Sequence, residues 1–154
     1  MKTLEIELQP PFWRPIIRLY GYAALVDTGA VIPVVSLPRA LMIKRFQAKL
    51  IKDNVSVGGF GGGNSVGDLY SLNNFYIHKF HFKTLECFVP YKPDKDFPII
   101  LSVPLFYHTH YEFRADESKM IINVMDDKLV NNVFLIKDLT QRICVQVNGV
   151  MLQC

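Results

Sequence analysis

The sequence predicts a mostly β fold with one or two short helices. Several segments alternate apolar and polar residues or form short apolar runs rich in β-branched and aromatic residues, as strands do. Prolines and glycines, nine of each, separate many of these segments. With 154 residues, 50% of them hydrophobic and 20% charged, the chain is long enough for one well-packed domain and too apolar to be disordered.

The N-terminal part contains three predicted strands. Thr3–Gln9 alternates apolar and charged residues, the pattern of a half-buried strand, and a pair of prolines ends it. Ile16–Val26 is predicted to be one long strand that leads to Asp27, and Val31–Val35 a second apolar strand.

A short helix and further strands follow. Arg39–Phe46 comes directly after Ser36-Leu37-Pro38, a combination typical of a capped helix start. Leu69–Phe82 and Lys83–Pro90 predict two or three strands, and Phe97–Phe106 predicts an apolar strand that runs into a short helix.

The C-terminal part is expected to form an extension outside the main domain. A hairpin is predicted around the turn at Glu117–Lys119, and we divide the chain there into a main domain, residues 1–125, and an extension, residues 126–154. Within the extension, two short apolar runs flank Asn148-Gly149, a strong signal for a two-residue β-hairpin turn.

One acidic residue stands in an apolar setting. Asp27 lies between Ala23–Val26 and Val31–Val35 and is followed by Thr28, Gly29 and Ala30. A buried carboxylate must be hydrogen-bonded, paired or protonated, so the pattern predicts a strand that presents Asp27 at the floor of a cleft. The alternative is an aspartate that only caps its own turn.

A glycine-rich stretch is the second informative feature. Five of the nine glycines fall between positions 58 and 63, and strand-like residues flank them, which predicts a hairpin with an exposed tip. The stretch imitates a phosphate-binding P-loop, but Asn64 stands where the phosphate-binding lysine is required.

Together, Asp27-Thr28-Gly29-Ala30 and the tip Gly58-Gly59-Phe60-Gly61-Gly62 resemble the retropepsins, the dimeric retroviral-type aspartic proteases. The resemblance covers about the first four-fifths of the chain. It implies a closed, barrel-like acid-protease fold with a flap hairpin, to which the chain adds a C-terminal β-hairpin. That hairpin would widen or replace the subunit interface, or would only cover an exposed sheet edge.

The resemblance also implies roles for individual residues. Asp27, Thr28 and Gly29 would be catalytic, and the substrate would contact a further set: Leu25, Ala30, Ile32, Gly58, Gly59, Phe60 and Gly61. A single Asp-Thr-Gly cannot supply the two carboxylates of the reaction, so the enzyme would be a homodimer that cleaves an extended peptide between apolar residues. The alternative is a catalytically silent, dimeric peptide-binding module of the same fold.

Two positions depart from the family pattern. Ile100-Leu101-Ser102 has Ser102 where retropepsins have glycine, and Val31 and Val103 stand where many relatives have an acidic residue and an arginine that pair. Losing both charges together leaves no unpaired buried ion, so we expect an apolar contact in place of the ion pair.

Other classes of function have little support. The net charge of +3 comes from scattered basic residues, which argues against nucleic-acid binding, and the four histidines lack partners at metal-ligand spacing, so no metal or cofactor is expected. Residues 21–38 are apolar but contain Asp27 and Pro33, so a membrane span is not expected. Three cysteines without a Cys-x-x-Cys motif, and no signal peptide, indicate a cytoplasmic protein without a disulfide framework.

Overall fold

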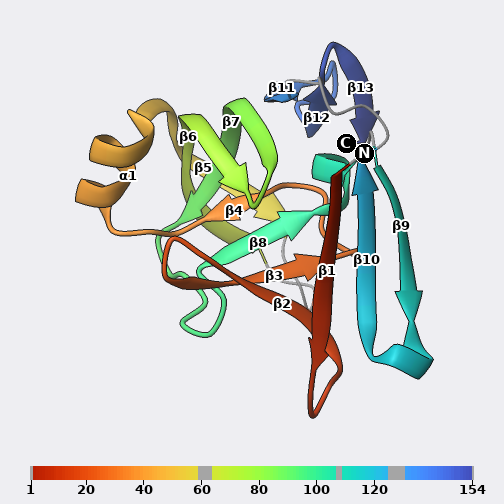
Figure 1. The fold of residues 1–154 in the computed structure, drawn as a ribbon. Helices are drawn as coiled ribbons and strands as arrows, with labels where there is room; N and C mark the ends of the chain where they lie inside the picture. Colours follow the sequence, from red (N-terminus) through yellow and green to blue (C-terminus); the bar gives the residue numbers. More distant parts are fainter. Residues whose placement is uncertain (1, 59–63, 107–108, 125–130, 154) are drawn as a thin grey trace.

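The computed structural model describes residues 2–58, 64–106, 109–124 and 131–153. The fold is mostly β, as predicted, with one α-helix and short 3-10 helices in the part described (Figure 1). The helices are α1 (Arg39–Phe46), η2 (Val103–Phe106) and η3 (Ala115–Glu117). The strands are β1 (Lys2–Gln9), β2 (Arg14–Leu19), β3 (Tyr22–Asp27), β4 (Val34–Val35), β5 (Lys49–Gly58), β6 (Asn64–Ile77), β7 (Phe80–Pro90), β8 (Ile99–Ser102), β9 (Thr109–Arg114), β10 (Lys119–Val124), β11 (Asn131–Lys137), β12 (Ile143–Val147) and β13 (Val150–Gln153).

The strands form one mixed sheet that does not close. Its order runs β13-β12-β11-β7-β4-β8-β3-β2-β1-β10-β9, and β6 pairs with both β5 and β7. The two ends of this order, β13 and β9, are not paired with each other, so the predicted closed, barrel-like sheet is wrong for the residues described. Among the residues described, the pairing instead leaves β5, β9 and β13 as edge strands.

A strand inserted between two neighbours organises the centre of the sheet. β8 pairs in parallel with β3 on one side and antiparallel with β4 on the other, although β3 and β4 follow each other in the chain. The segment from Asp27 to Pro33 must therefore cross the end of β8 to reach β4. This crossing creates the loop that carries Thr28, Gly29 and Ala30.

The long predicted strand Ile16–Val26 is in fact two strands, β2 and β3, which pair antiparallel. Tyr20 and Gly21 form the turn, with φ angles of 55° and 87°. Positive φ is unusual for tyrosine, and for that reason its position gave no turn signal. The centroid of the Tyr20 ring lies 4.8 Å from that of Phe46 in α1 and 5.4 Å from that of Phe75 in β6, and this packing holds α1 against β6.

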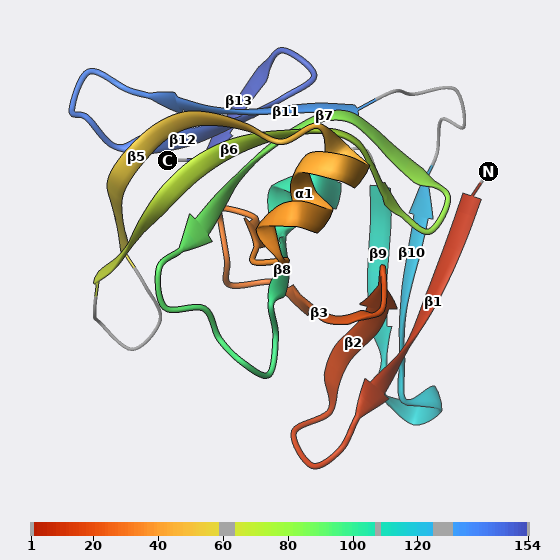
Figure 2. The same ribbon diagram turned by 90° about the vertical axis from the view of Figure 1, so that its left-hand side faces the viewer.

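A long hairpin is formed by β5 and β6, which lie side by side as a curved ribbon (Figure 2). Gly58 pairs with Asn64 at its end, so the predicted hairpin is confirmed, while its tip, residues 59–63, lies outside the described residues. The next turn comes at His78 and Lys79, earlier than the predicted boundary at Lys83.

The C-terminal strands extend the main sheet. β11, in a segment for which no strand was predicted, pairs in parallel with β7, and the predicted hairpin β12–β13 continues from it through Asn148-Gly149. Val133, Val145 and Val147 are buried in the same core as the N-terminal strands. Cys144 is disulfide-bonded, which the odd number of cysteines did not indicate.

Candidate active site

Asp27 ends β3 and turns the chain away from the sheet. Its Oδ1 accepts a hydrogen bond from the Gly29 N–H at 2.9 Å, and its carbonyl accepts one from the Ala30 N–H at 3.2 Å. The side chain of Asp27 is half-buried, whereas Thr28 and Gly29 are exposed. A Cβ on Gly29 would lie 3.4 Å from Asp27 Oδ1, an ordinary contact, so glycine is not required there by crowding within one chain.

β8 lies directly behind the Asp27 loop. Asp27 pairs with Ser102 and Leu25 pairs with Ile100 across the parallel strands. Ser102 is fully buried, and its hydroxyl has no hydrogen-bond partner in the part of the chain described. The side chain of Val103 is not among those described, so the expected contact between Val31 and Val103 remains a prediction.

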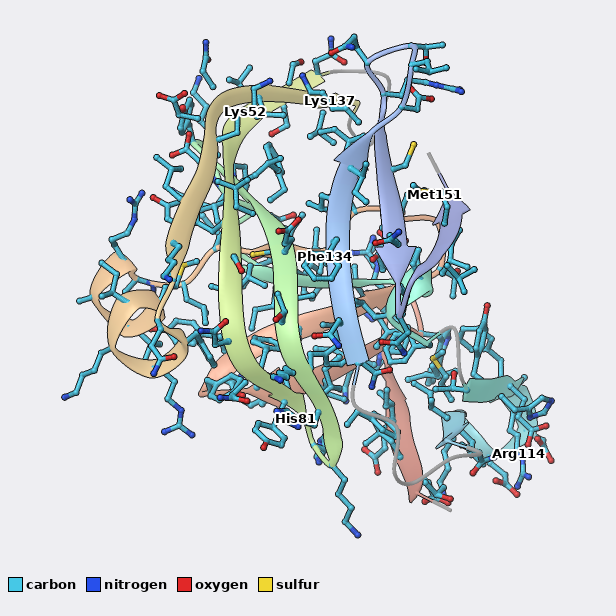
Figure 3. The ribbon with its side chains drawn as sticks, turned by 90° about the horizontal axis from the view of Figure 1, so that it is seen from above. Lys52, His81, Arg114, Phe134, Lys137 and Met151 are labelled. Atoms are coloured by element: carbon cyan, nitrogen blue, oxygen red, sulfur yellow. The ribbon has the colours of Figure 1, made fainter. Side chains whose placement is uncertain are left out.

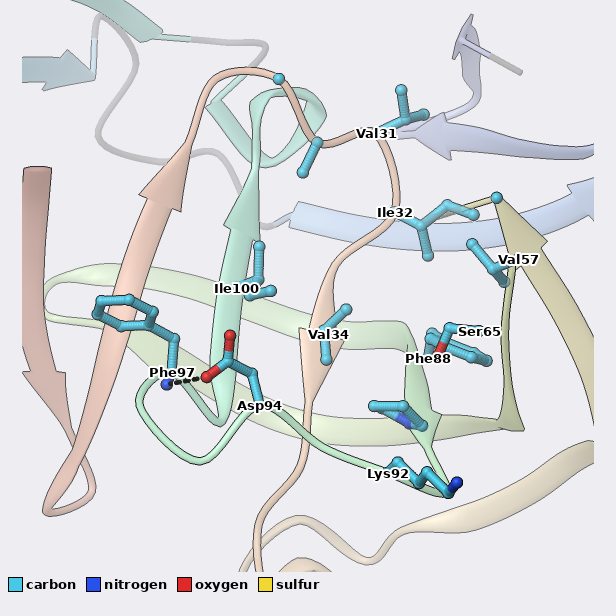
Figure 4. Close-up of a pocket in the computed structure, with 14 residues that line it drawn as sticks. Val31, Ile32, Val34, Val57, Ser65, Phe88, Lys92, Asp94, Phe97 and Ile100 are labelled. Atoms are coloured by element: carbon cyan, nitrogen blue, oxygen red, sulfur yellow. Dashed lines mark hydrogen bonds between the residues drawn. The ribbon is translucent and has the colours of Figure 1, made fainter. Parts of the chain in front are cut away.

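A cavity of about 350 Å³ opens beside this loop (Figure 4). Its walls come from residues 29–34, the end of the hairpin β5–β6, the end of β7, the loop after β7, and β8, and the predicted catalytic residues Asp27 and Thr28 do not line it. The lining residues are Gly29, Ala30, Val31, Ile32, Val34, Val57, Gly58, Ser65, Phe88, Pro90, Lys92, Asp94, Phe97 and Ile100. Most of these residues are apolar, so the cavity suits apolar groups of a ligand.

The structure brings part of the predicted site together. Gly29, Ala30, Ile32 and Gly58 all line the cavity, and Asp27 stands at the start of the loop that forms its wall. Leu25 does not line it but is paired with Ile100, which does. The predicted contacts from Gly59, Phe60 and Gly61 lie outside the described residues.

Sequence reasoning missed the charged residues of the cavity. Lys92 and Asp94 belong to the turn-rich loop between Pro90 and Pro98, which gave no sign of facing a cleft. The Asp94 carboxylate is engaged locally, since its Oδ1 accepts hydrogen bonds from the N–H groups of Asp96 and Phe97 at 2.8 and 3.3 Å. This bonding fixes the loop and brings Phe97 to the cavity wall.

The hairpin β5–β6 is anchored at its base over this cavity. The Tyr91 hydroxyl donates a hydrogen bond to Asp68 Oδ1 at 2.7 Å and accepts one from the Asn54 N–H at 3.1 Å. The Tyr91 N–H donates to the Val66 carbonyl at 2.9 Å. These bonds tie both arms of the hairpin to the loop after β7, so the end of the hairpin keeps a defined position beside the Asp27 loop.

The histidines do not assemble a metal site in the part of the chain that the structure describes. His81 stacks on Tyr76 at 4.5 Å and its Nε2 lies 2.8 Å from Asn74 Oδ1. No group of three or more His, Cys, Asp or Glu side chains able to hold a metal ion occurs among the described residues. No described helix is long and apolar enough to cross a membrane.

In comparisons with known proteins, no family model, no curated protein and no solved structure matches the chain.

Proposed function

We propose that the chain is an aspartic endopeptidase that acts as a homodimer, with Asp27 of each subunit at the two-fold axis. The observation that carries the proposal is the position of Asp27. It ends a central strand, the loop that follows it forms one wall of an apolar cavity, and the hairpin β5–β6 contributes Val57, Gly58 and Ser65 to the same cavity. An acid protease needs these three parts.

The proposed reaction requires a second carboxylate, which a second subunit would supply. Two carboxylates within a few ångströms cannot both ionise, so they share one proton, and the protonated member serves as acid while the other serves as base. The base takes a proton from water as the water oxygen attacks the peptide carbonyl carbon, and the acid protonates the carbonyl oxygen. The C–N bond then breaks as the amide nitrogen receives a proton. The sequence has one Asp-Thr-Gly, which supplies one of the two carboxylates.

The exposure of the loop supports such an assembly. Thr28 and Gly29 are exposed in the single chain although they follow a strand whose other residues are at least half-buried. In the proposed dimer, the Thr28 hydroxyls brace the two loops against each other and Gly29 offers its backbone to the peptide.

The substrate is an extended peptide that lies between the Asp27 loop and the hairpin β5–β6, bonded through its backbone as an added strand. Ile32, Val57, Phe88 and Ile100 line the cavity, and they favour apolar side chains beside the cut bond. The hairpin tip would cover the peptide and exclude water.

The test compares wild type with Asp27→Asn on a peptide library between mildly acidic and neutral pH. Wild type should cleave peptides between apolar residues, and Asp27→Asn should lose this activity while its melting temperature does not fall. Asp116→Asn is the matched control, because Asp116 is an exposed residue of η3, and it should cleave like wild type. Equal cleavage by wild type and Asp27→Asn would refute the enzymatic proposal.

Sedimentation at a range of protein concentrations tests the assembly separately. The proposal expects a dimer and activity that rises faster than linearly with concentration near the dissociation constant. A monomer that cleaves peptides at full rate would contradict it.

One observation favours a second candidate, a dimeric peptide-binding module without turnover. Ser102 is buried beside Asp27 with an unpartnered hydroxyl, at the position where the resemblance implies glycine. A module of this kind would bind the same peptides in wild type and in Asp27→Asn and release them uncut.

A further inference from the structure

A second cavity, of about 450 Å³, lies next to the first and has the C-terminal extension as one wall. The two cavities share Val31, Ile32, Val57 and Gly58, so a ligand in the first cavity reaches the second without leaving the protein surface. The far wall consists of Gln141 and Arg142, from the turn between β11 and β12, and Ile143, the first residue of β12.

Packing joins the extension to the cleft. Ile143 belongs to a small apolar cluster, centred on Val55, Leu69 and Phe88, against which Ile32 and Val57 also pack. The extension therefore contacts the same side chains that form the walls of the candidate active site, rather than only covering the edge of β7.

The guanidinium of Arg142 is held in place by its own turn. Its Nε donates hydrogen bonds to Asp138 Oδ2 at 3.2 Å and to Thr140 Oγ1 at 3.0 Å. Asp138 in turn accepts the N–H groups of Thr140 and Arg142 at 2.8 and 2.9 Å, which fixes the turn. Only Nε is used in these bonds, so the two terminal nitrogens keep their donors for a ligand.

Two lysines add positive charge at the same end of the molecule (Figure 3). Lys137 pairs with Ile143, which lines the cavity, and Lys52 of β5 lies close to Lys137; the cavity lining itself includes neither lysine. The Lys52 ammonium, close beside it, lowers the pKa of Lys137. Neither lysine forms an ion pair with another described residue, so Asp138 is the one acidic partner in this group of three cations.

We propose that this second cavity is a specificity subsite that binds an acidic side chain of the peptide, at a fixed distance along the chain from the cut bond. The inference rests on the proposed function, because the first cavity must hold the peptide for its acidic residue to reach Arg142 in the second. A carboxylate there gains charge-assisted hydrogen bonds from Arg142 and the attraction of the two lysines beside the cavity.

The test uses acetylated, amidated peptides that share one apolar cleavage sequence and carry a single glutamate at successive positions. Each is matched to a peptide with glutamine at that position. For one position, kcat/KM should be about five- to tenfold higher with glutamate, and the preference should shrink as salt is added. Equal rates for every pair would overturn the inference while leaving the proposed function intact.

Charge-reversal variants test whether the preference for glutamate comes from Lys137 and Arg142. Lys137→Glu and Arg142→Glu should each abolish the preference for glutamate, and Arg142→Lys should retain part of it. Lys44→Glu, on the exposed face of α1, is the matched control and should keep the full preference. Since Arg142→Glu also disturbs the turn at Asp138, a loss limited to that variant would count against the subsite.

Binding gives a readout that does not need turnover. Fluorescence anisotropy with Asp27→Asn and the same labelled peptides should show the glutamate preference at the same position. If no peptide is cleaved by wild type, the proposed function fails, and the anisotropy result alone then decides whether the basic cavity selects acidic peptides. Equal affinity for the glutamate and glutamine peptides would overturn the subsite in that case too.

Discussion

Asp27 and Ser102 are paired across β3 and β8 and are the last residues of these two parallel strands. The carboxylate proposed to do the chemistry therefore has a buried hydroxyl as its neighbour in the sheet. The hydroxyl finds no hydrogen-bond partner in the described chain, and an unpaired buried polar group destabilises the folded state.

Ser102→Ala should raise the free energy of unfolding by about 1 kcal/mol, because it removes this unpaired hydroxyl without opening a large cavity. Urea unfolding measures the change. Ser71→Ala, at a half-buried position of β6, should change stability by less than about 0.5 kcal/mol. A loss of stability in Ser102→Ala would mean that the hydroxyl has a partner, for instance across a subunit interface.

Gly67→Ala should destabilise the protein by at least about 2 kcal/mol, because a Cβ there would lie 2.2 Å from the Val89 carbonyl oxygen. Gly67 pairs with Pro90 at one end of the antiparallel ladder between β6 and β7, so neither backbone can move there without breaking that pairing. Gly58→Ala is the control, since no atom of the described residues lies within 4 Å of a Cβ at that position. Thermal unfolding of both variants distinguishes crowding from a general loss of glycine flexibility, which predicts similar changes.

The Asp27 loop and α1 could be predicted from the sequence because their signals are local. An aspartate between apolar runs, followed by glycine, specifies a strand end and a turn, and Arg39–Phe46 is helical over the predicted range. The glycine-rich hairpin is equally local, and its arms β5 and β6 pair as expected.

The remaining errors come from contacts between distant parts of the chain. Tyr20 takes positive φ because its ring packs on Phe46 and Phe75, which no local pattern reveals. β11 pairs with β7, about 50 residues earlier in the chain, and its apolar run Val133–Ile136 is a strand signal that was missed, because the run is short and polar residues flank it. The open sheet has the same origin, since closure depends on which distant strands pair. Arg142 lies beside the second cavity only because β11 pairs with β7, so this cavity could not be predicted from the sequence.

The burial of the extension leads to a third prediction. Val133 of β11 is fully buried in the main core, whereas Val150 at the start of β13 is 42% exposed. Val133→Ala should lower the free energy of unfolding by about 2 kcal/mol, and Val150→Ala by less than about 0.5 kcal/mol. Urea unfolding that monitors the whole chain should show one transition. Two separate transitions, with only the weaker one shifted by Val133→Ala, would mean that the extension unfolds on its own.

Glu86 links β7 to β11 and makes stability depend on pH. Its Oε1 accepts the Leu135 N–H at 2.8 Å, and partial burial of the carboxyl raises its pKa above the ordinary value of 4.5, an effect that the hydrogen bond from Leu135 partly offsets. Because the pKa is higher in the folded protein than in the unfolded chain, the folded state binds the proton more tightly. The stability contributed by the protonated carboxyl is complete below the ordinary pKa and is lost as pH rises through the raised one.

Glu86→Gln should remove this dependence, because the glutamine oxygen can still accept the Leu135 N–H while the side chain cannot ionise. Relative to the variant, wild type should become progressively less stable as pH is raised from about 4 to about 7. Urea unfolding at a series of pH values measures the difference in free energy, and Glu7→Gln, at an exposed position of β1, serves as the matched control with a flat difference. If the difference between wild type and Glu86→Gln is constant with pH, Glu86 titrates alike in the folded and unfolded states, and the contact between β7 and β11 is not the source of any acid dependence.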